Sequence, residues 1–359
     1  MTGVRTVTGT VPSSELGLTL THEHLHNDVR RAVTPPSDPD LAWLRDADTS
    51  ADIAWLLREH PYSCLDHCTL DDPRPVADDL AAFAAAGGGT VVDVTPPGLG
   101  RDPRVLRRLS EQTGVRIVMG SGWYLERFHP SDLSTRDTEE LAASLVEEFR
   151  SGVDDTGVTP GVIGEIGVSP AFTPAERHAL RAAALAQLEL GVPLYVHLPG
   201  WQRRAHEVLD VVLDEIGVPP AAVVLCHMDP SGGDVAYQRA VADRDVWLEF
   251  DMIGMPFRYP GEGQSPAPAD TARAVAGLIA DGFADRVLLS HDVFLKSMLT
   301  VHGGNGFRYV PTLFTDRLHE LGVPAHTTDD LVRANPARLF ETASSTDPQR
   351  REPHTWHGY

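Results

Sequence analysis

The stretch TLTHEHL, residues 19–25, combines strand-forming residues with two histidines that are separated by one residue. In an extended strand alternate side chains share a face, so His22 and His24 point the same way and Glu23 points away. On a helix the same spacing would place the two imidazoles roughly 200° apart. The motif indicates a strand that ends in two metal ligands. A packed or surface pair of histidines is the alternative, because two histidines alone hold an ion weakly.

Outward from this stretch, strand and helix patterns alternate along the chain. Short runs such as VVDV and VVLC are apolar on both faces, as strands covered by helices must be. The predicted strands cover residues 19–25, 90–95, 115–120, 161–167, 193–197, 222–227, 246–251 and 287–292. A capped helix begins at Pro103, and the last predicted helix, 328–334, is closed by Asn335 and Pro336.

Eight strands with helices between them, on one chain of 359 residues, favour an α/β fold of the (β/α)8 TIM barrel type. An open doubly wound sheet is the alternative, but no GxGxxG follows a first strand. We expect a short N-terminal hairpin over residues 1–17. The long first βα loop, 25–75, is more typical of a lid or binding loop than of a plain connector. The barrel is predicted as a single domain, 1–340, followed by a polar tail, 341–359.

Composition narrows the partners and the compartment. Hydrophobic residues make up 42%, and no apolar run approaches the ~20 residues that span a bilayer, so no membrane association is expected. The formal charge of −21 repels nucleic acids and anionic membranes, which leaves a small-molecule substrate. No secretory signal is visible and the three cysteines fit a reducing environment, so we expect a cytoplasmic protein. Cys64 and Cys68 bracket His67, but this spacing alone is weak evidence for metal.

Imidazole and carboxylate groups stand at the ends of five predicted strands. They are His22, His24, Glu165, His197, His227, His291 and Asp292. Active sites of such barrels lie at the carboxyl ends of the strands, and these residue types bind zinc and similar cations. Without His291, the four histidines and two carboxylates exceed the three protein ligands of a mononuclear catalytic zinc site. They fit two divalent ions about 3.5–4 Å apart with a bridging carboxylate.

Such a centre predicts hydrolytic chemistry, in which a metal-bridging hydroxide attacks a carbonyl or phosphoryl centre. Zinc is the first candidate, and manganese, cobalt or iron suit the same ligands. Asp292 is the natural proton acceptor, because it is a carboxylate at a strand end beside the bound water. His291 alternates to the opposite face, so we expect it to pack or hydrogen-bond outside the ligand set.

Loops after the third and eighth strands supply candidates for the walls of a substrate pocket. These candidates are Trp123, Tyr124, His129, Arg308 and Tyr309. Aromatic residues in such positions are as often structural, so the sequence leaves their roles open.

A set of segments in fixed order resembles the phosphotriesterase family of the amidohydrolase superfamily. The segments are GLTLTHEHL, GVIGEIG, VHLPG, CHMD, LEFD, LLSHD, GGNGFRY and NPARLF, and the match spans roughly residues 4–340. The chain is most similar to the phosphotriesterase-related branch. In the organophosphate-degrading enzymes a carboxylated lysine bridges the metals, whereas Glu165 stands at the matching position here.

The resemblance implies a division of the ligands between two ions. His22, His24 and Asp292 would hold the more buried ion and His197 and His227 the more exposed one, with Glu165 bridging. It also implies that PYSCLD, residues 61–66, lies near the pocket, and it makes a homodimer a reasonable expectation.

Three functions are therefore weighed. The first is a dinuclear metal-dependent hydrolase of ester, lactone, amide or phosphoester bonds. The second narrows the substrate to an N-acyl amino acid or related amide, because the related branch includes acyl-amide hydrolases. The third is a non-catalytic metal-containing binding protein, and the complete ligand set with Asp292 retained argues against it.

Overall fold

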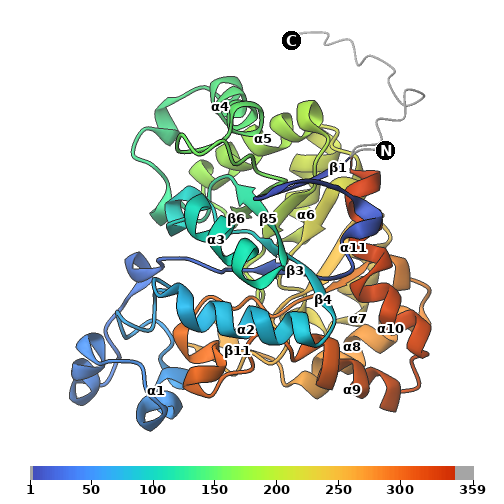
Figure 1. The fold of residues 1–359 in the computed structure, drawn as a ribbon. Helices are drawn as coiled ribbons and strands as arrows, with labels where there is room; N and C mark the ends of the chain where they lie inside the picture. Colours follow the sequence, from blue (N-terminus) through green and yellow to red (C-terminus); the bar gives the residue numbers. More distant parts are fainter. Residues whose placement is uncertain (1–2, 344–359) are drawn as a thin grey trace.

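Eight parallel strands form a closed barrel in the computed structural model, which describes residues 3–343 (Figure 1). Neighbouring strands follow the order β12-β9-β8-β7-β6-β5-β4-β3. The strands are β3 (Leu18–Glu23), β4 (Gly88–Asp93), β5 (Arg116–Ser121), β6 (Val162–Gly167), β7 (Leu194–His197), β8 (Val223–Leu225), β9 (Trp247–Phe250) and β12 (Val287–Leu289). The ring closes between its first and last strands, where the Asp292 amide donates to the His22 carbonyl oxygen at 3.2 Å. The predicted (β/α)8 barrel is confirmed.

Helices surround the barrel and cover the outer faces of its strands (Figure 1). They are α2 (Pro73–Ala85), α3 (Pro103–Thr113), α4 (Thr138–Ser151), α5 (Pro174–Leu190), α6 (Ala205–Leu209), α7 (Val235–Ala242), α8 (Pro268–Ala280), α9 (Thr315–Glu320), α10 (Ala325–Val332) and α11 (Ala334–Thr342). Apolar side chains on the inner helix faces pack against the strands in the largest core cluster. Every helix in the described part of the chain is too short or too polar to cross a bilayer.

A separate apolar cluster fills the inside of the barrel. It contains Val94, which follows β4, and from the strands Val92, Val118, Val162, Tyr195, Val224, Trp247 and Leu288. The predicted hairpin, β1 (Gly3–Thr6) and β2 (Gly9–Pro12), contributes Val4, and α11 contributes Leu339 and Phe340. The hairpin lies against the start of β5, since the Val7 amide donates to Ile117 O at 2.9 Å. These elements close the amino-terminal end of the barrel, so a ligand can enter only at the carboxyl ends of the strands.

The long first loop holds short 3-10 turns and the helix α1 (Ala54–Glu59), and it extends from one side of the barrel (Figure 1). The segment before α8 contains a small hairpin, β10 (Arg258–Tyr259) and β11 (Gly263–Gln264). Both segments lie next to the cavity described below, to which Tyr62 and Tyr259 contribute.

The C-terminal helices correct one prediction. Asn335 and Pro336 do not close a helix but lie in the first turn of α11, which runs on to Thr342. A proline is tolerated there because the first amides of a helix have no partner within it. The Asn335 side chain donates to Ala284 O and Val287 O and so anchors this helix to β12. Residues 341 and 342 of the predicted tail belong to this helix, and residues 344–359 lie outside the described part of the chain.

Candidate metal centre

Two histidines and an aspartate meet where the barrel ring closes. His22 and His24 lie at the end of β3 and share a face, as the period of a strand predicts. Asp292, just beyond β12, places Oδ1 3.6 Å from His22 Nε2 and 3.2 Å from His24 Nε2. All three side chains are buried. Their ligand atoms lie within 4.8 Å of one another, which is close enough to contact one ion.

Glu165, near the end of β6, lies between this group and a second pair of histidines. Its Oε1 is 3.4 Å from His24 Nε2. Its Oε2 is 3.0 Å from His197 Nδ1 and 3.6 Å from His227 Nε2. The His197 and His227 ring nitrogens are themselves 2.7 Å apart. One carboxylate thus faces both groups with different oxygens, which is the arrangement that a ligand shared by two ions requires.

The backbone turns sharply at two of these positions. His227 and Asp292 have φ values of 59° and 53°, in the left-handed region that residues other than glycine seldom adopt. These turns end β8 and β12 earlier than the sequence predicts and aim both side chains into the barrel mouth. Strained backbone of this kind is concentrated at functional sites, where the surrounding structure stabilises it.

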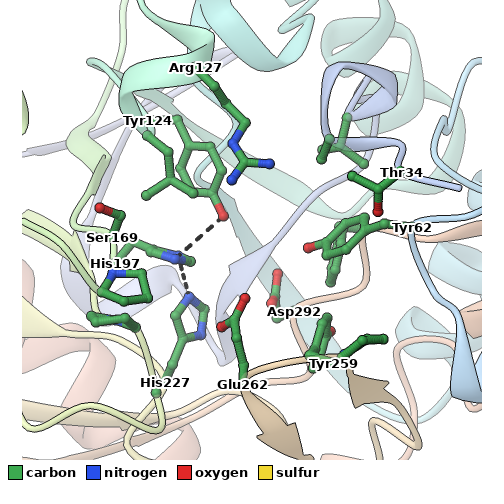
Figure 2. Close-up of a pocket in the computed structure, with 18 of the residues that line it drawn as sticks. Thr34, Tyr62, Tyr124, Arg127, Ser169, His197, His227, Tyr259, Glu262 and Asp292 are labelled. Carbon is green, nitrogen blue, oxygen red and sulfur yellow. Dashed lines mark hydrogen bonds between the residues drawn. The ribbon is translucent and has the colours of Figure 1, made fainter. Parts of the chain in front are cut away.

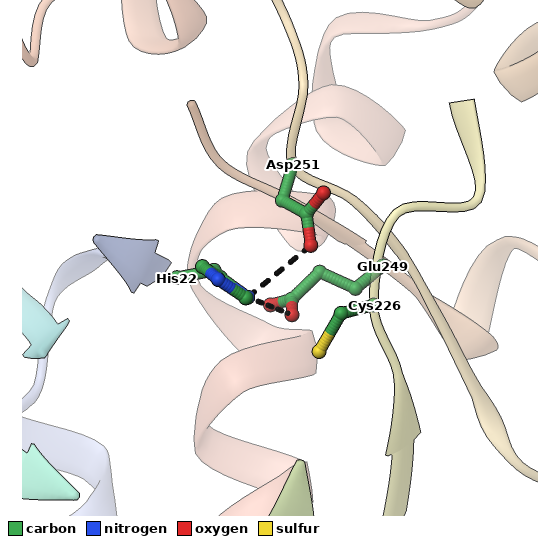
Figure 3. A group of neighbouring side chains, drawn as sticks. All are labelled: His22, Cys226, Glu249 and Asp251. Carbon is green, nitrogen blue, oxygen red and sulfur yellow. Dashed lines mark hydrogen bonds and ion pairs between the residues drawn. The ribbon is translucent and has the colours of Figure 1, made fainter. Parts of the chain in front are cut away.

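A second layer of polar groups fixes the orientation of the rings. Asp251 Oδ1 lies 2.7 Å from His227 Nδ1, and Asp251 Oδ2 lies 3.2 Å from His22 Nδ1. Glu249 Oε2 lies 3.1 Å from the same His22 nitrogen. Both carboxylates follow β9 or lie in it, and Figure 3 shows them converging on His22. With Nδ1 bonded to a carboxylate, the Nε2 atom of each ring is left to face the centre.

Sequence reasoning did not select Glu249 or Asp251, although LEFD carries the signal that could have found them. Two carboxylates in alternate positions of a buried strand share a face and need partners. Cys226 lies beside them in the same group (Figure 3). Burial raises the pKa of the Cys226 thiol well above its usual range, so it remains protonated and acts as a packing group here.

The charges of the centre are coupled. Burial opposes ionisation of Glu165, but His197, His227 and His24 outweigh it and hold the pKa of Glu165 well below its usual range. Burial also opposes protonation of His22 and His24, yet the surrounding carboxylates raise the pKa of His22 to about 9 and that of His24 to about 10. Any cation that binds here must therefore displace protons from the rings.

The surroundings of His22 Nε2 indicate whether a cation fits this centre. His22 Nε2 is buried and has no hydrogen-bond partner within residues 3–343. Its nearest acidic neighbours are Asp292 Oδ1 at 3.6 Å and Glu165 Oε2 at 3.8 Å, both beyond hydrogen-bond length. An unpartnered buried nitrogen is costly unless something else binds it. The donor set of imidazoles and carboxylates suits zinc, manganese, cobalt or iron, so the residues fit the group.

Glu23 and His291 serve the barrel rather than the centre. Glu23 points away from its neighbouring histidines and is fully buried. It accepts hydrogen bonds from Ser290 Oγ, the His291 amide and the Val293 amide, at 2.7, 3.0 and 2.8 Å. His291 Nδ1 is 2.7 Å from the same carboxylate, and its Nε2 accepts from the Val310 amide. His291 therefore bonds outside the ligand set, as predicted, and Glu23 ties the last strand to the first.

A cavity of about 550 Å³ opens above the centre (Figure 2). Glu165, His197, His227 and Asp292 lie on its wall. The long first loop supplies another part of the wall, which is lined by Asn27, Val29, Ala32, Thr34, Pro35, Pro36, Ser37, His60, Tyr62 and Ser63. The expectation that this insertion is a binding loop is thus supported by its position, and PYSCLD reaches the pocket through Tyr62 and Ser63.

Of the loop residues proposed as pocket walls, the structure brings only Tyr124 to the cavity. Its hydroxyl lies 3.5 Å from His197 Nε2. Gly167 permits this approach, because a Cβ there would lie 2.3 Å from the Tyr124 carbonyl carbon. Trp123 packs into the core instead, and His129 bonds to the Tyr124 carbonyl. Arg308 and Tyr309 are also absent from the lining, so of the five candidates whose roles the sequence leaves open, four lie away from the cavity wall.

A (β/α)8 barrel with imidazole and carboxylate groups gathered at its open mouth is the arrangement of metal-dependent barrel hydrolases. The comparisons agree. The phosphotriesterase family model matches residues 2–340. N-acetyltaurine hydrolase from Tetraodon nigroviridis is 34% identical over 337 residues, which is 93% of this chain and 96% of that protein. The chain belongs to the phosphotriesterase family and is a hydrolase.

Solved structures place the fold in the same group. A resiniferatoxin-binding protein from Rhodobacter sphaeroides is 45% identical, with a TM-score of 0.93 over 96% of both chains. A lactonase from Listeria monocytogenes is 25% identical, with a TM-score of 0.75 over 94% of this chain and 99% of that one. The likeness extends over nearly the whole chain, so the barrel and its insertion are both shared features.

Proposed function

We propose that the protein is a dinuclear metal-dependent hydrolase that cleaves an amide bond of a small N-acylated compound. His22, His24 and Asp292 would hold one divalent ion, His197 and His227 the other, and Glu165 both. Zinc is the first candidate for each position. The free buried thiols of Cys64, Cys68 and Cys226 support a cytoplasmic location, where thiols stay reduced.

The observation that carries this proposal is the unpartnered His22 Nε2 beside a carboxylate that faces two groups of ligands. In a purely structural cluster, most buried nitrogens find a partner within the protein. Here Nδ1 of His22 is bonded to Glu249, while Nε2 is aimed at Asp292 and Glu165 at distances too long for hydrogen bonds. An ion between them would supply the missing partner.

Divalent ions bound at such a centre lower the pKa of water and polarise a substrate carbonyl. The chain's own residues supply the remaining functions. Asp292 lies both beside the ligands and on the cavity wall, so its carboxylate can accept the proton of the attacking water and return it to the leaving nitrogen. The Tyr124 hydroxyl lies on the same wall and can orient the acyl oxygen.

An amide is favoured over other bonds by the relatives. N-acetyltaurine hydrolase matches 93% of the chain at 34% identity, whereas two solved lactonases are 25% and 29% identical. A lactone is the second candidate, because both reactions begin with attack of water on an acyl carbon. The same residues can serve amide or lactone hydrolysis, and the cavity residues away from the metal centre decide which substrate binds.

Metal analysis combined with a substrate screen tests the proposal. The purified protein should contain close to two divalent ions per chain and release acetate from N-acetylated small acids. Replacement of both His22 and His24 by alanine should remove the ion that they contact and abolish turnover. The double variant Trp123→Phe and His129→Gln is a matched control, because neither residue lines the cavity. It should keep its bound metal and its turnover. Full turnover by the metal-free protein would contradict the proposal.

A further inference from the structure

Two arginines line the cavity, Arg127 and Arg258, and the chemistry described above uses neither. Arg127 belongs to the turn Glu126–Phe128, which follows β5, and it lines the same cavity as His197 and Asp292. It is exposed, whereas Asp292 is buried, so the guanidinium lies toward the opening and the carboxylate at the base. Figure 2 shows the Arg127 side chain directed into the pocket.

The Arg127 guanidinium has no hydrogen-bond or ion-pair partner within residues 3–343. The other arginine on the wall, Arg258, lies 4.0 Å from the Glu59 carboxylate and so has a partner. Arg127 faces Tyr62 and Glu262 on the opposite side (Figure 2). The charge of Arg127 acts on Glu262. Burial raises the pKa of Glu262, while His197 and Arg127 act to lower it. An unpaired cation thus points into the space above the centre.

The cavity wall away from this cation carries a group of aromatic side chains. Tyr62 and Tyr259 have ring centroids 5.8 Å apart, and Trp201 and Tyr259 have centroids 5.4 Å apart. Phe294 packs on Tyr62 at 6.3 Å. Such a wall accommodates the carbon chain of a ligand but offers little to a charged end group. Of the two arginines on the cavity wall, Arg127 is the one without an ion-pair partner within residues 3–343, so it is free to meet the charged end of a ligand.

We propose that Arg127 selects substrates whose amine part ends in a carboxylate or a sulfonate. This inference rests on the proposed function, because it assumes that the acyl group lies at the metal centre. The planar guanidinium can donate two parallel N–H groups to two oxygens of either anion, whereas a carboxamide presents only one acceptor oxygen. Glu262 on the facing wall excludes a second anion there, so the anionic end of the substrate has one position. Arg127 is a specificity-determining residue and takes no part in bond cleavage.

A matched pair of substrates tests this role on the metal-loaded full-length enzyme. N-acetyl-β-alanine and N-acetyl-β-alaninamide share the same scissile bond and differ only in a terminal carboxylate or carboxamide. We expect kcat/KM of the unmodified enzyme to be at least tenfold higher for the carboxylate. Arg127→Gln should remove this preference through a 10- to 100-fold rise in KM for the carboxylate, with kcat changed less than threefold and the carboxamide unaffected.

Two further variants and a binding measurement complete the test. Arg127→Lys should keep part of the preference, because the positive charge remains but the two parallel N–H donors of the guanidinium are lost. Arg308→Gln should keep all of it, since Arg308 is an exposed arginine away from the cavity lining. Binding of N-methylsulfonyl-β-alanine, whose sulfonamide resists hydrolysis, is measured by titration calorimetry and should weaken at least tenfold in Arg127→Gln.

The outcomes separate this inference from the proposed function. If Arg127→Gln keeps the carboxylate preference and binds the sulfonamide normally, the role of Arg127 is overturned. An equal loss for both members of the pair also overturns it, because the effect would then be general. If the unmodified enzyme cleaves neither amide, the amide proposal fails, and the calorimetric comparison still decides whether Arg127 binds the anion.

Discussion

Replacement of Asp251 by asparagine tests whether one carboxylate supports both halves of the centre. Asp251 contacts the Nδ1 atoms of His227 and His22, at 2.7 and 3.2 Å, and its oxygens also accept from the His227 amide at 3.1 and 3.0 Å. Asparagine keeps the shape but replaces one acceptor by an NH2 group and removes the charge. A donor then faces a donor, and both rings lose the negative charge that fixes their orientation.

The expected loss can be worked from these contacts. Removing a partner behind a metal-ligating histidine costs about 10- to 100-fold in metal affinity, which is about 1.4–2.7 kcal/mol. Because Asp251 faces one ring from each group, both ions should weaken by about this amount. Competition with a chelator, followed by metal analysis, measures the two affinities. Turnover at saturating metal should recover in part, since the ligands themselves remain.

Glu249→Gln is the matched control, because Glu249 contacts His22 but not His227. Its effect should be confined to the ion that His22 holds. Thermal unfolding of the metal-free variants establishes that each is folded. A folded Asp251→Asn protein with both metal affinities within twofold of the unmodified protein would refute the reasoning.

Glu165→Gln should leave at most one tightly bound ion per chain, because a neutral amide cannot bridge two cations; metal analysis after dialysis measures this. Glu23→Gln should lower the free energy of unfolding by about 2–3 kcal/mol in urea denaturation, because an NH2 group would face donors that now meet a carboxylate. Burial lowers the pKa of His67 from 6.5 to about 4. The unfolded chain therefore binds this proton first, and stability should fall by about 3 kcal/mol as the pH drops from 6.5 to 4, a loss that His67→Gln should reduce.

Each of these has a result that would contradict it. Two ions retained by Glu165→Gln would remove the bridging role. An unchanged urea midpoint in Glu23→Gln would show that the carboxylate does not tie the barrel. A His67→Gln protein with the same pH slope of stability as the unmodified protein would show that His67 is not the group that takes up the proton.

The barrel could be predicted from the sequence because its strands are apolar on both faces and its helices on one. Stretches such as VVDV fit few structures other than a buried strand. The period of two in THEH places His22 and His24 on one face wherever that strand lies. The metal-ligand candidates could be selected for the same reason. They are polar residues at the ends of apolar runs, and parallel strands of a barrel bring those ends to one mouth.

The C-terminal helices were harder to predict. Asn335 and Pro336 carry the composition of a helix end, and local preference alone predicts a stop there. The structure uses them to start α11, because the Asn335 side chain finds acceptors next to β12 that lie far away in the sequence. A tertiary contact thus outweighed a local signal.

The sequence by itself determined which strand ends bear imidazoles and carboxylates, because residue type and strand period are local properties. Only the tertiary structure decided that Asp251 lies behind two rings and that Tyr124 rather than Trp123 reaches the cavity. It also decided that Arg127 points into that cavity without a partner. These facts depend on which side chains of distant segments meet, and packing settles that over the whole barrel rather than within any one strand or loop.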